Sequence, residues 1–409
     1  MSGFYKLKYI LLIVLICFPS GCGTVNKNTT GSVPSQKPED TKVTDKAGPV
    51  GTEASTDVTD NTDEAKLKEA ISCIQNKKYP QAIGLLSQIK DSVKAEDLLE
   101  QLRYIISGAY IANLGAGIAA IDNDGKVKII TDNSIYEYYQ YNEVSDWVDI
   151  KYLSYAHGRL DALDKDGVIH STRDTDTSYD YVVDQLKSYT DLSAISTDYD
   201  NYVLLSRNGN IYAYSAKYSD TLNTFQDRIS TWKDVVDVVT GQLRIAALKK
   251  DGTVYVADYN KYLNPSYDYL YDEIAGWTNI VAISSASIGP IAGLKSDGTV
   301  VISTSYITGT RNNNFYYVSD WNDIIAISKS STTLLGLKSD GTVVATGDNE
   351  QEQLDVSGWT DIVAVAAGNW ISIGLKSDGT LVIAGKTEEG VTTPDVSGVN
   401  NLYVPVVTY

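Results

Sequence analysis

The octapeptide GLKSDGTV occurs at residues 293–300 and again, unchanged, at 336–343. It occurs a third time at 374–381 as GLKSDGTL. Apolar residues alternate before the Asp-Gly pair and continue after it, as residues 371–375 and 381–383 show. Asp-Gly favours a tight hairpin turn because the turn requires φ > 0, which glycine adopts without steric cost. Each copy therefore predicts two antiparallel strands joined by a short turn.

Turns of the same kind recur through most of the chain. The glycines that mark them are Gly125, Gly167, Gly209, Gly252, Gly298, Gly341 and Gly379. An aromatic residue followed by a polar residue and an Ile/Val pair leads six of the units, namely Trp147, Tyr189, Trp232, Trp277, Trp321 and Trp359. Such a period is the signature of a repeat architecture, and three strands plus a variable fourth in about forty residues make one propeller blade. The sequence predicts an all-β fold, a seven-bladed β-propeller over residues 110–409.

The two ends of the repeat region fit a closed ring. The first unit lacks an aromatic-led strand, whereas DVSGVNNLYVPVVTY at the C-terminus aligns with DVSGWTDIVAVAAGN at 355–369. We expect this spare C-terminal strand to complete the first blade, which would leave the ring without an open edge. Pro405 has no N–H to donate, so it should lie where the ladder needs no hydrogen bond.

The repeat pattern W-x-D-I-V-A-[IV]-x-x-G…G-L-K-x-D-G-T-V resembles the bacterial branch of the RCC1 (regulator of chromosome condensation) repeat, most specifically over 277–385. The resemblance covers about residues 110–409 and implies a seven-bladed propeller. WD40 repeats have a similar period, but their Gly-His and Trp-Asp signatures are missing. The best-known eukaryotic RCC1 protein exchanges nucleotide on a small GTPase through a specialised wedge that has no match here, so no GTPase partner is expected. A secreted inhibitor of β-lactamases has a similar propeller, which favours protein binding as the generic use.

The N-terminus predicts export. Lys6 and Lys8 precede an apolar run of ten residues, which suits a signal peptide over residues 1–21. Pro19-Ser20-Gly21-Cys22 resembles the lipobox of bacterial lipoproteins, although Pro19 departs from the usual leucine. This resemblance implies that Cys22 carries a lipid and that the chain is an extracytoplasmic lipoprotein attached to the cell membrane. An uncleaved anchor or an ordinary secretory signal stays open, and both also place the chain outside the cytoplasm.

Two segments separate the signal from the propeller. Residues 22–62 are rich in Thr, Asp, Pro and Ser and lack aromatic residues, so we expect a disordered tether. Residues 63–107 have apolar residues at helical spacing, and YPQAIGLLSQI resembles part of a tetratricopeptide repeat. One and a half repeats cannot form a stable solenoid alone. We therefore expect a small helical hairpin packed on its neighbour, with a third helix at about Lys94 to Ile106.

Composition excludes several functions. The formal net charge of −18 disfavours nucleic acid as a partner. With only two histidines and three cysteines, the chain offers little for metal, cofactor or nucleophilic chemistry. We predict a protein that is not an enzyme, with no catalytic residues, no metal and no cofactor. A two-carboxylate glycosidase site stays open, although hairpin turns account for most aspartates.

Tyrosine is the informative departure from the repeat. Of 30 tyrosines, 23 lie between Tyr136 and Tyr317, mostly between a third strand and the next aromatic marker. Tyrosine with Asp, Ser and Asn is typical of paratopes, because the ring offers a large contact area at low entropy cost. Tyrosine is also a good strand former, so a purely structural role stays open. The candidate ligand-binding residues are Tyr138, Tyr139, Tyr141, Tyr179, Tyr181, Tyr267, Tyr269, Tyr271, Tyr316 and Tyr317.

Three functions fit these observations. The first is a lipid-anchored, non-enzymatic binding module that recognises an extracytoplasmic protein through its Tyr/Asp-rich loops. The second is binding of a cell-wall glycan by the same rings, since aromatic faces stack on sugars and carboxylates accept their hydroxyls. The third is a structural spacer or scaffold with no tight ligand. For the first, the negative charge would steer a basic partner, and the association should weaken as salt is raised.

Overall fold

A computed structural model describes most of the chain from residue 61 onward. The described ranges are 61–131, 136, 141–156, 158–172, 185–198, 201–215, 226, 228–241, 244–258, 274–286, 289–303, 316–387 and 392–409. Residues Val58–Tyr409 belong to one compact unit. The predicted signal peptide, Cys22 and the tether lie outside the described residues.

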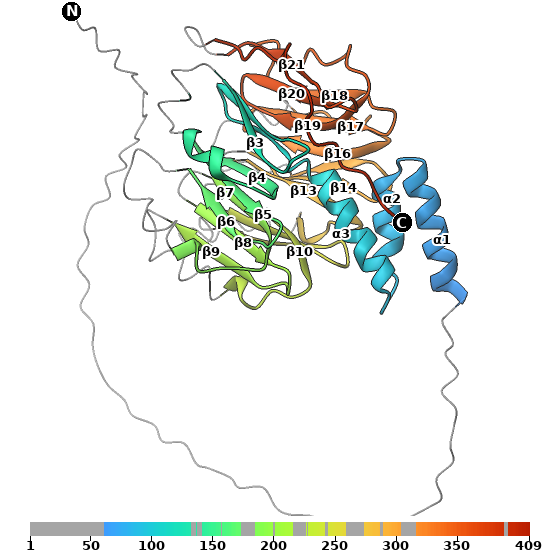
Figure 1. The fold of residues 1–409 in the computed structure, drawn as a ribbon. Coiled ribbons are helices and arrows are strands. Elements are labelled where there is room, and N and C mark those ends of the chain that lie inside the picture. The colour runs from blue at the N-terminus through green and yellow to red at the C-terminus, as the bar shows by residue number, and fades with distance from the viewer. Residues whose placement is uncertain are drawn as a thin grey trace, which may run out of the picture. The chain divides into compact units, whose positions relative to one another are not determined.

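The strands form seven three-stranded antiparallel sheets, each made of consecutive strands (Figure 1). In chain order the blades are β1(Ile111–Asn113), β2(Gly117–Ile121) and β3(Val127–Thr131); β4(Ile150–Ala156), β5(Arg159–Asp164) and β6(Ile169–Ser171); β7(Leu192–Asp198), β8(Asn201–Ser206) and β9(Ile211–Ser215); β10(Val235–Gly241), β11(Arg244–Lys249) and β12(Val254–Asp258); β13(Ile280–Ser284), β14(Ala292–Lys295) and β15(Val300–Ile302); β16(Ile324–Lys329), β17(Thr333–Lys338) and β18(Val343–Gly347); β19(Ile362–Ala367), β20(Ile371–Lys376) and β21(Leu381–Gly385). The seven-bladed propeller expected from the repeat is confirmed.

One part of the repeat prediction is corrected. The sequence predicted a variable fourth strand in each blade, but residues 348–361 of blade 6, all of them described, contain no strand. That segment is held by side-chain contacts instead, such as Asn349 Oδ1 accepting from the Leu354 N–H at 2.8 Å.

The hairpins form as the Asp-Gly pairs predict. All seven marker glycines have φ between +71° and +84°. In blades 5 to 7 the turn aspartate is occupied locally: Asp297, Asp340 and Asp378 each accept from the backbone N–H and the hydroxyl of the threonine two residues on. These bonds hold the pKa of the Asp340 carboxyl below its usual value. The repeated motif is therefore structural, and its carboxylates are already engaged.

The first strands of the blades form the inner ring. Each of β1, β4, β7, β10, β13, β16 and β19 contacts the first strand of the next blade, and β19 contacts β1. Serine side chains join neighbours across this ring. Ser154 Oγ accepts from the Thr197 N–H at 3.2 Å, and Ser328 Oγ accepts from the Ala367 N–H at 3.0 Å. These bonds satisfy backbone groups that the inner strands, as edge strands, leave unpaired within their own sheets.

The ring closes with residues from both ends of the repeat region. Ile111 pairs with Ala120 in blade 1, while Leu402 bridges to Asp122 in the same blade. The Leu402 N–H also donates to the Gly379 carbonyl of blade 7, at 3.3 Å. The C-terminal segment therefore closes the seam as expected, but as a single bridge rather than a whole strand. β1 fills the rest of the inner position, and Thr408 instead meets Gln101 of a helix, its N–H donating to Gln101 Oε1 at 2.8 Å.

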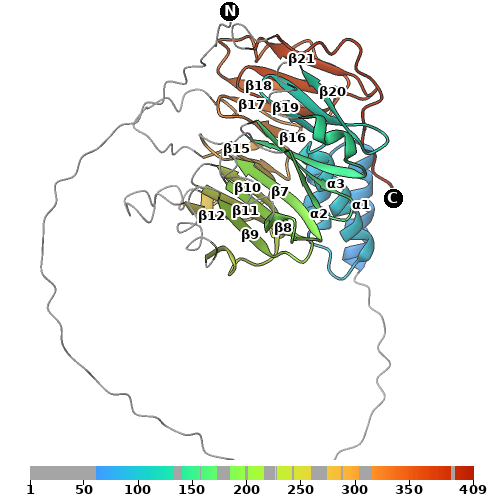
Figure 2. The same cartoon turned by 60° about the vertical axis from the view of Figure 1, so that its left-hand side comes forward.

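Between residue 61 and the propeller, the structure describes three helices, α1(Asn61–Gln75), α2(Tyr79–Leu86) and α3(Val93–Ser107). Ser92 caps α3 by accepting from the Ala95 N–H at 3.3 Å, and Gly108 ends it with φ of +63°. The buried faces of α2 and α3 share one apolar cluster with blades 5 to 7, and both helices contact β13 and β16 (Figures 1 and 2). This segment is helical and packs on the neighbouring blades as expected, and α3 lies where the third helix was expected.

Leu402→Ala tests the seam. Leu402 is 1% exposed, so its truncation should lower the free energy of unfolding by about 2–4 kcal/mol. Val406→Ala is the control, because Val406 is 78% exposed, and it should change stability by less than about 0.5 kcal/mol. Urea denaturation of both variants measures the difference. Equal stabilities would mean that the C-terminal bridge does not hold the ring closed.

Candidate functional site

The propeller has two faces, which we name by their connections. The turn face carries the Asp-Gly hairpins, and the loop face carries the connections between the first and second strands of the blades. The helices contact the turn face, where Lys250 Nζ lies 3.9 Å from Glu96 Oε1 of α3. A Cβ added at Gly84 of α2 would lie 2.8 Å from Ser296 Cβ in the blade 5 turn. The third strands end at the loop face, and the Tyr-rich segments follow them in the sequence.

Most of the predicted ligand-binding tyrosines are outside the described residues, namely Tyr138, Tyr139, Tyr179, Tyr181, Tyr267, Tyr269 and Tyr271. Tyr141 is described, and its predicted role is corrected: it is 0% exposed. It begins the short 3-10 helix η1(Tyr141–Asp146), and its ring packs edge-on to Tyr136, with the centroids 6.2 Å apart. Because apolar residues of blades 1 and 2 enclose it, Tyr141 supports the core and does not face solvent.

Tyr316 and Tyr317 have opposite roles. The Tyr316 hydroxyl donates to the Ser331 carbonyl at 2.9 Å, and its ring centroid lies 5.3 Å from Lys329 Nζ. The Tyr317 N–H donates to Thr346 Oγ1 at 3.0 Å, while its side chain is 69% exposed. The backbone of this pair is thus fixed on blade 6 and one ring is presented to solvent. A ring held in this way loses little entropy on binding.

A buried lysine lies beneath this pair. Lys329 is 6% exposed, and its Nζ donates to the Ser330 carbonyl at 2.8 Å. Burial lowers the pKa of Lys329 to about 7, and the nearby Arg244 guanidinium adds to the shift. Arg244 itself donates to the Gly289 carbonyl of blade 5. Sequence reasoning missed this cation, because a lysine at the end of a strand is usually solvated.

Lys329→Met tests the cost of this buried cation. The unfolded chain binds the lysine proton up to about pH 10.5, whereas the folded protein loses it near pH 7. The wild type should therefore gain stability as the pH rises between these values. We expect the variant to be more stable by about 1–3 kcal/mol at pH 6, with the gain disappearing towards pH 10.5.

Urea denaturation at several pH values measures this dependence. The matched control is Lys386→Met, because the Lys386 side chain is 62% exposed. It should show little dependence on pH. A Lys329→Met difference that is the same at pH 6 and pH 10 would contradict the assigned protonation.

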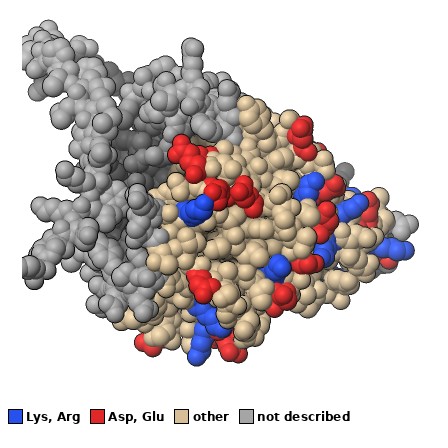
Figure 3. Space-filling view, turned by 90° about the horizontal axis from the view of Figure 1, so that it is seen from above, with Lys and Arg blue, Asp and Glu red and all other residues tan. Residues whose placement is uncertain are grey.

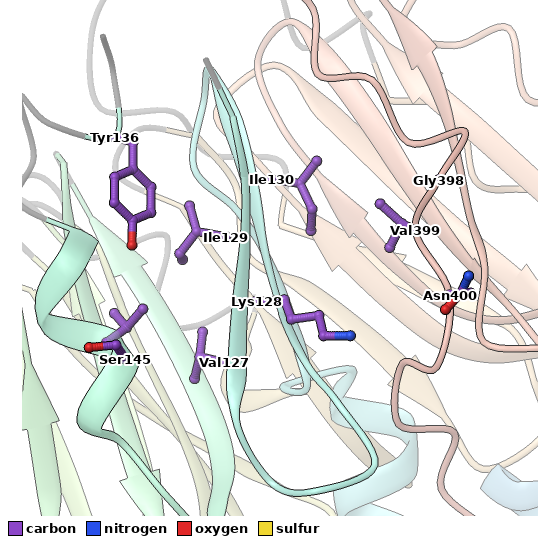
Figure 4. A pocket seen from close by; sticks show the side chains of 10 residues that line it. Val127, Lys128, Ile129, Ile130, Tyr136, Ser145, Gly398, Val399 and Asn400 are labelled. Carbon is purple, nitrogen blue, oxygen red and sulfur yellow. The ribbon is translucent and has the colours of Figure 1, made fainter. Parts of the chain in front are cut away.

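A pocket of about 400 Å³ lies at the outer edge of blade 1, between β3, η1 and the C-terminal segment (Figure 4). Val127 and Ile129 point from β3 towards Tyr136 and Ser145. On the other side of the strand, the pocket is lined by Lys128, Ile130, Val399 and Asn400, with Val144 and Gly398 completing the wall. Its volume is within the range of roughly 300–1,000 Å³ typical of ligand pockets. The pattern of the sequence did not predict this pocket.

Charge is not segregated on the visible described surface. Figure 3 shows acidic and basic side chains intermixed there. Exposed ion pairs also occur among the described residues, such as Lys165 with Asp149 at 2.7 Å and Arg207 with Asp191 at 3.1 Å. Exposed pairs of this kind contribute little to stability. The electrostatic steering expected from the net charge is therefore a property of the whole chain rather than of one acidic patch seen here.

The described residues contain few groups for chemistry. Within the described ranges no cluster of three His, Cys, Asp or Glu side chains could hold a metal ion. His170 Nε2 lies 3.0 Å from Asp164 Oδ2, and its ring packs beside Trp147, so it has structural partners, as expected. His157 is outside the described residues. In the part of the chain that is described, no helix has the length and apolar character to cross a membrane.

Comparisons with known proteins show similarity in fold only. No protein-family model and no curated protein matches this chain. Prp20p of Saccharomyces cerevisiae, described for its binding to Gsp1p and histones, is similar at 14% identity over 72% of this chain and 84% of that chain, with a TM-score of 0.42. The ectodomain of the receptor kinase CR4 from Physcomitrella patens is similar at 11% identity over 67% and 72%, with a TM-score of 0.41. The propeller assignment rests on the seven sheets of this chain.

Proposed function

We propose that this chain is a non-enzymatic binding module outside the cytoplasm, held at the membrane by a lipid on Cys22, and that it recognises a protein partner. The partner contacts the Tyr/Asp-rich segments at the loop face. The helices contact the turn face, so the loop face is the side left for a second protein.

The exposed ring of Tyr317 on a fixed backbone carries this proposal. The hydroxyl of its neighbour Tyr316 donates a hydrogen bond to the Ser331 carbonyl, and the Tyr317 N–H donates one to Thr346 Oγ1. The exposed ring therefore projects from a rigid blade. Aromatic side chains that are already held in place are the residues that most often dominate the free energy of protein association. A closed propeller holds such a side chain on a rigid sheet.

Tyr317→Ala tests the partner surface in the full-length protein. Epitope-tagged wild type and variant are crosslinked in the producing cells and purified, and captured proteins are identified by mass spectrometry. Loss of a central aromatic contact costs at least about 1 kcal/mol, so we expect recovery of the partner to fall about fivefold or more. Recovery should also fall as salt is raised, because the chain carries a net charge of −18.

Tyr409→Ala is the matched control. Tyr409 is 58% exposed, and it follows Thr408, which binds Gln101 of α3. This control should recover as much partner as the wild type. Equal recovery by the wild type and Tyr317→Ala would remove the support for this surface. Capture of a cell-wall glycan in place of a protein would favour the glycan function.

The lipid anchor is tested separately with Cys22→Ser. The lipobox chemistry requires the thiol of Cys22, so the variant should incorporate no labelled fatty acid and should leave the membrane fraction. The expected control is Cys73→Ser, because Cys73 lies in the helical segment, half-buried against the apolar cluster. If Cys22→Ser stays lipidated, the anchor is elsewhere.

A further inference from the structure

A hydrogen-bonded turn precedes each of the inner strands of blades 2 to 7, and an equivalent turn precedes the Leu402 bridge of blade 1. In it, the N–H of the residue at the aromatic marker position donates to the carbonyl three residues earlier. The seven donors are Trp147, Tyr189, Trp232, Trp277, Trp321, Trp359 and Val399, and their bonds measure 2.9–3.1 Å. The residue two positions later has a positive φ in every case, as at Asp361 (+61°) and Asn401 (+63°). Residues 396–402 are therefore the turn that belongs to blade 1, with valine in place of the aromatic residue.

The aromatic rings have a definite place in the other blades. Trp277, Trp321 and Trp359 lie against the glycine of the second strand, so that a Cβ added at Gly374 would be 2.8 Å from Trp359 Cζ3. Gly374 pairs with Val382 on the third strand, and the same register in blade 1 pairs Ala120 with Lys128. Lys128 and Val399 both line the pocket (Figure 4). The pocket thus opens where the ring of the other repeats is replaced by a smaller side chain.

One position of the third strand is less covered in blade 1 than in most of the other blades. Ile130 lies two residues after Lys128 on β3. In the five blades led by tryptophan, the residue equivalent to Ile130, at or just after the end of the third strand, is 8% exposed or less. Those residues are Thr172, Ala257, Ser303, Thr346 and Ala384. Ile130 occupies this register in blade 1 and is only half-buried. An apolar side chain is therefore left partly open to the pocket, and filling the pocket would remove its surface from water.

We propose that this pocket binds an aromatic side chain, of the indole type, inserted by the partner protein. Val399 and Ile130 would contact the ring, as apolar side chains contact the tryptophans of the other blades. The partner's ring would occupy the position that the tryptophan ring of the blade itself occupies in other blades. The inference rests on the proposed function only in taking the ligand to be a protein.

The rim of the pocket suits such a ring. Lys128 is 41% exposed, and its ammonium lies 3.9 Å from Asp122 Oδ2. A lysine ammonium over an aromatic ring is favourable. The described residues already contain such contacts, for example Lys249 Nζ 5.2 Å from the Tyr255 centroid and Lys151 Nζ 5.4 Å from that of Tyr403. The indole N–H needs an acceptor at the edge of an apolar site. The Asn400 amide lines the pocket on the same side of β3 as Val399, and its oxygen can accept this bond.

The test uses 5-fluoroindole as the probe and the full-length protein, with binding followed by fluorine NMR. We expect saturable binding to the wild type. Val399→Trp places the covalent ring in the pocket, so binding should weaken at least about tenfold, while the melting temperature should rise by a few degrees because a cavity is filled. Val406→Trp is the matched control, because it adds the same indole at a side chain that is 78% exposed and should leave binding unchanged.

A second variant covers the case in which Val399→Trp does not fold. Ile130→Thr copies the residue that blades 2 and 6 carry at this register, Thr172 and Thr346, and should weaken binding without loss of the fold. Absence of saturable binding to the wild type, or equal binding to Val399→Trp, would overturn the proposal. Free indole binds without the partner protein, so a failure of this test would not count against the Tyr317 surface. A failure of the Tyr317 test would likewise not count against this pocket.

Discussion

Closure of the inner ring is the constraint on which the other features depend. A propeller blade buries its faces only against its neighbours, so an open seam would expose two faces and an unpaired edge. Here the seam between blades 7 and 1 is joined by Leu402, which bonds to the Gly379 turn and bridges to Asp122. The C-terminal turn repeats the geometry of the six internal turns, including the positive φ at Asn401. The same short segment thus closes the ring and forms one wall of the pocket.

The helices are attached through this closed ring. Tyr104 of α3 and Tyr110, just before β1, pack with Tyr403 of the C-terminal segment, and the three ring centroids are 5.6–6.3 Å apart. Aromatic contacts of this kind add to the stability supplied by area burial. Burial also raises the pKa of Tyr104 and Tyr110, so both hydroxyls stay protonated at alkaline pH values where a solvent-exposed tyrosine ionises. The last turns of α3, the residue before β1 and the C-terminal segment therefore stabilise one another.

Departures from the repeat are where binding features arise. The regular units use their aromatic marker and turn aspartate internally, which leaves little to recognise a partner. Blade 1 carries Val399 at the marker position and has a pocket there, and the segment entering blade 6 presents Tyr317 beside the anchored Tyr316. The repeated residues therefore stabilise the fold, whereas the residues that depart from the repeat are the ones available for binding.

The sequence by itself determined the blade count, the hairpins and the helical segment, because these depend on local chemistry. Asp-Gly specifies φ > 0 at the turn, and the alternation of apolar residues specifies strands, whatever the rest of the chain does. The tertiary structure decided what depends on residues far apart in the chain. Tyr141 and Tyr317 come from similar Tyr-rich segments, yet one is enclosed by neighbouring blades and the other is exposed. The buried charge of Lys329, the shared inner strand of blade 1 and the pocket beside Val399 likewise follow from packing between segments that no local pattern relates.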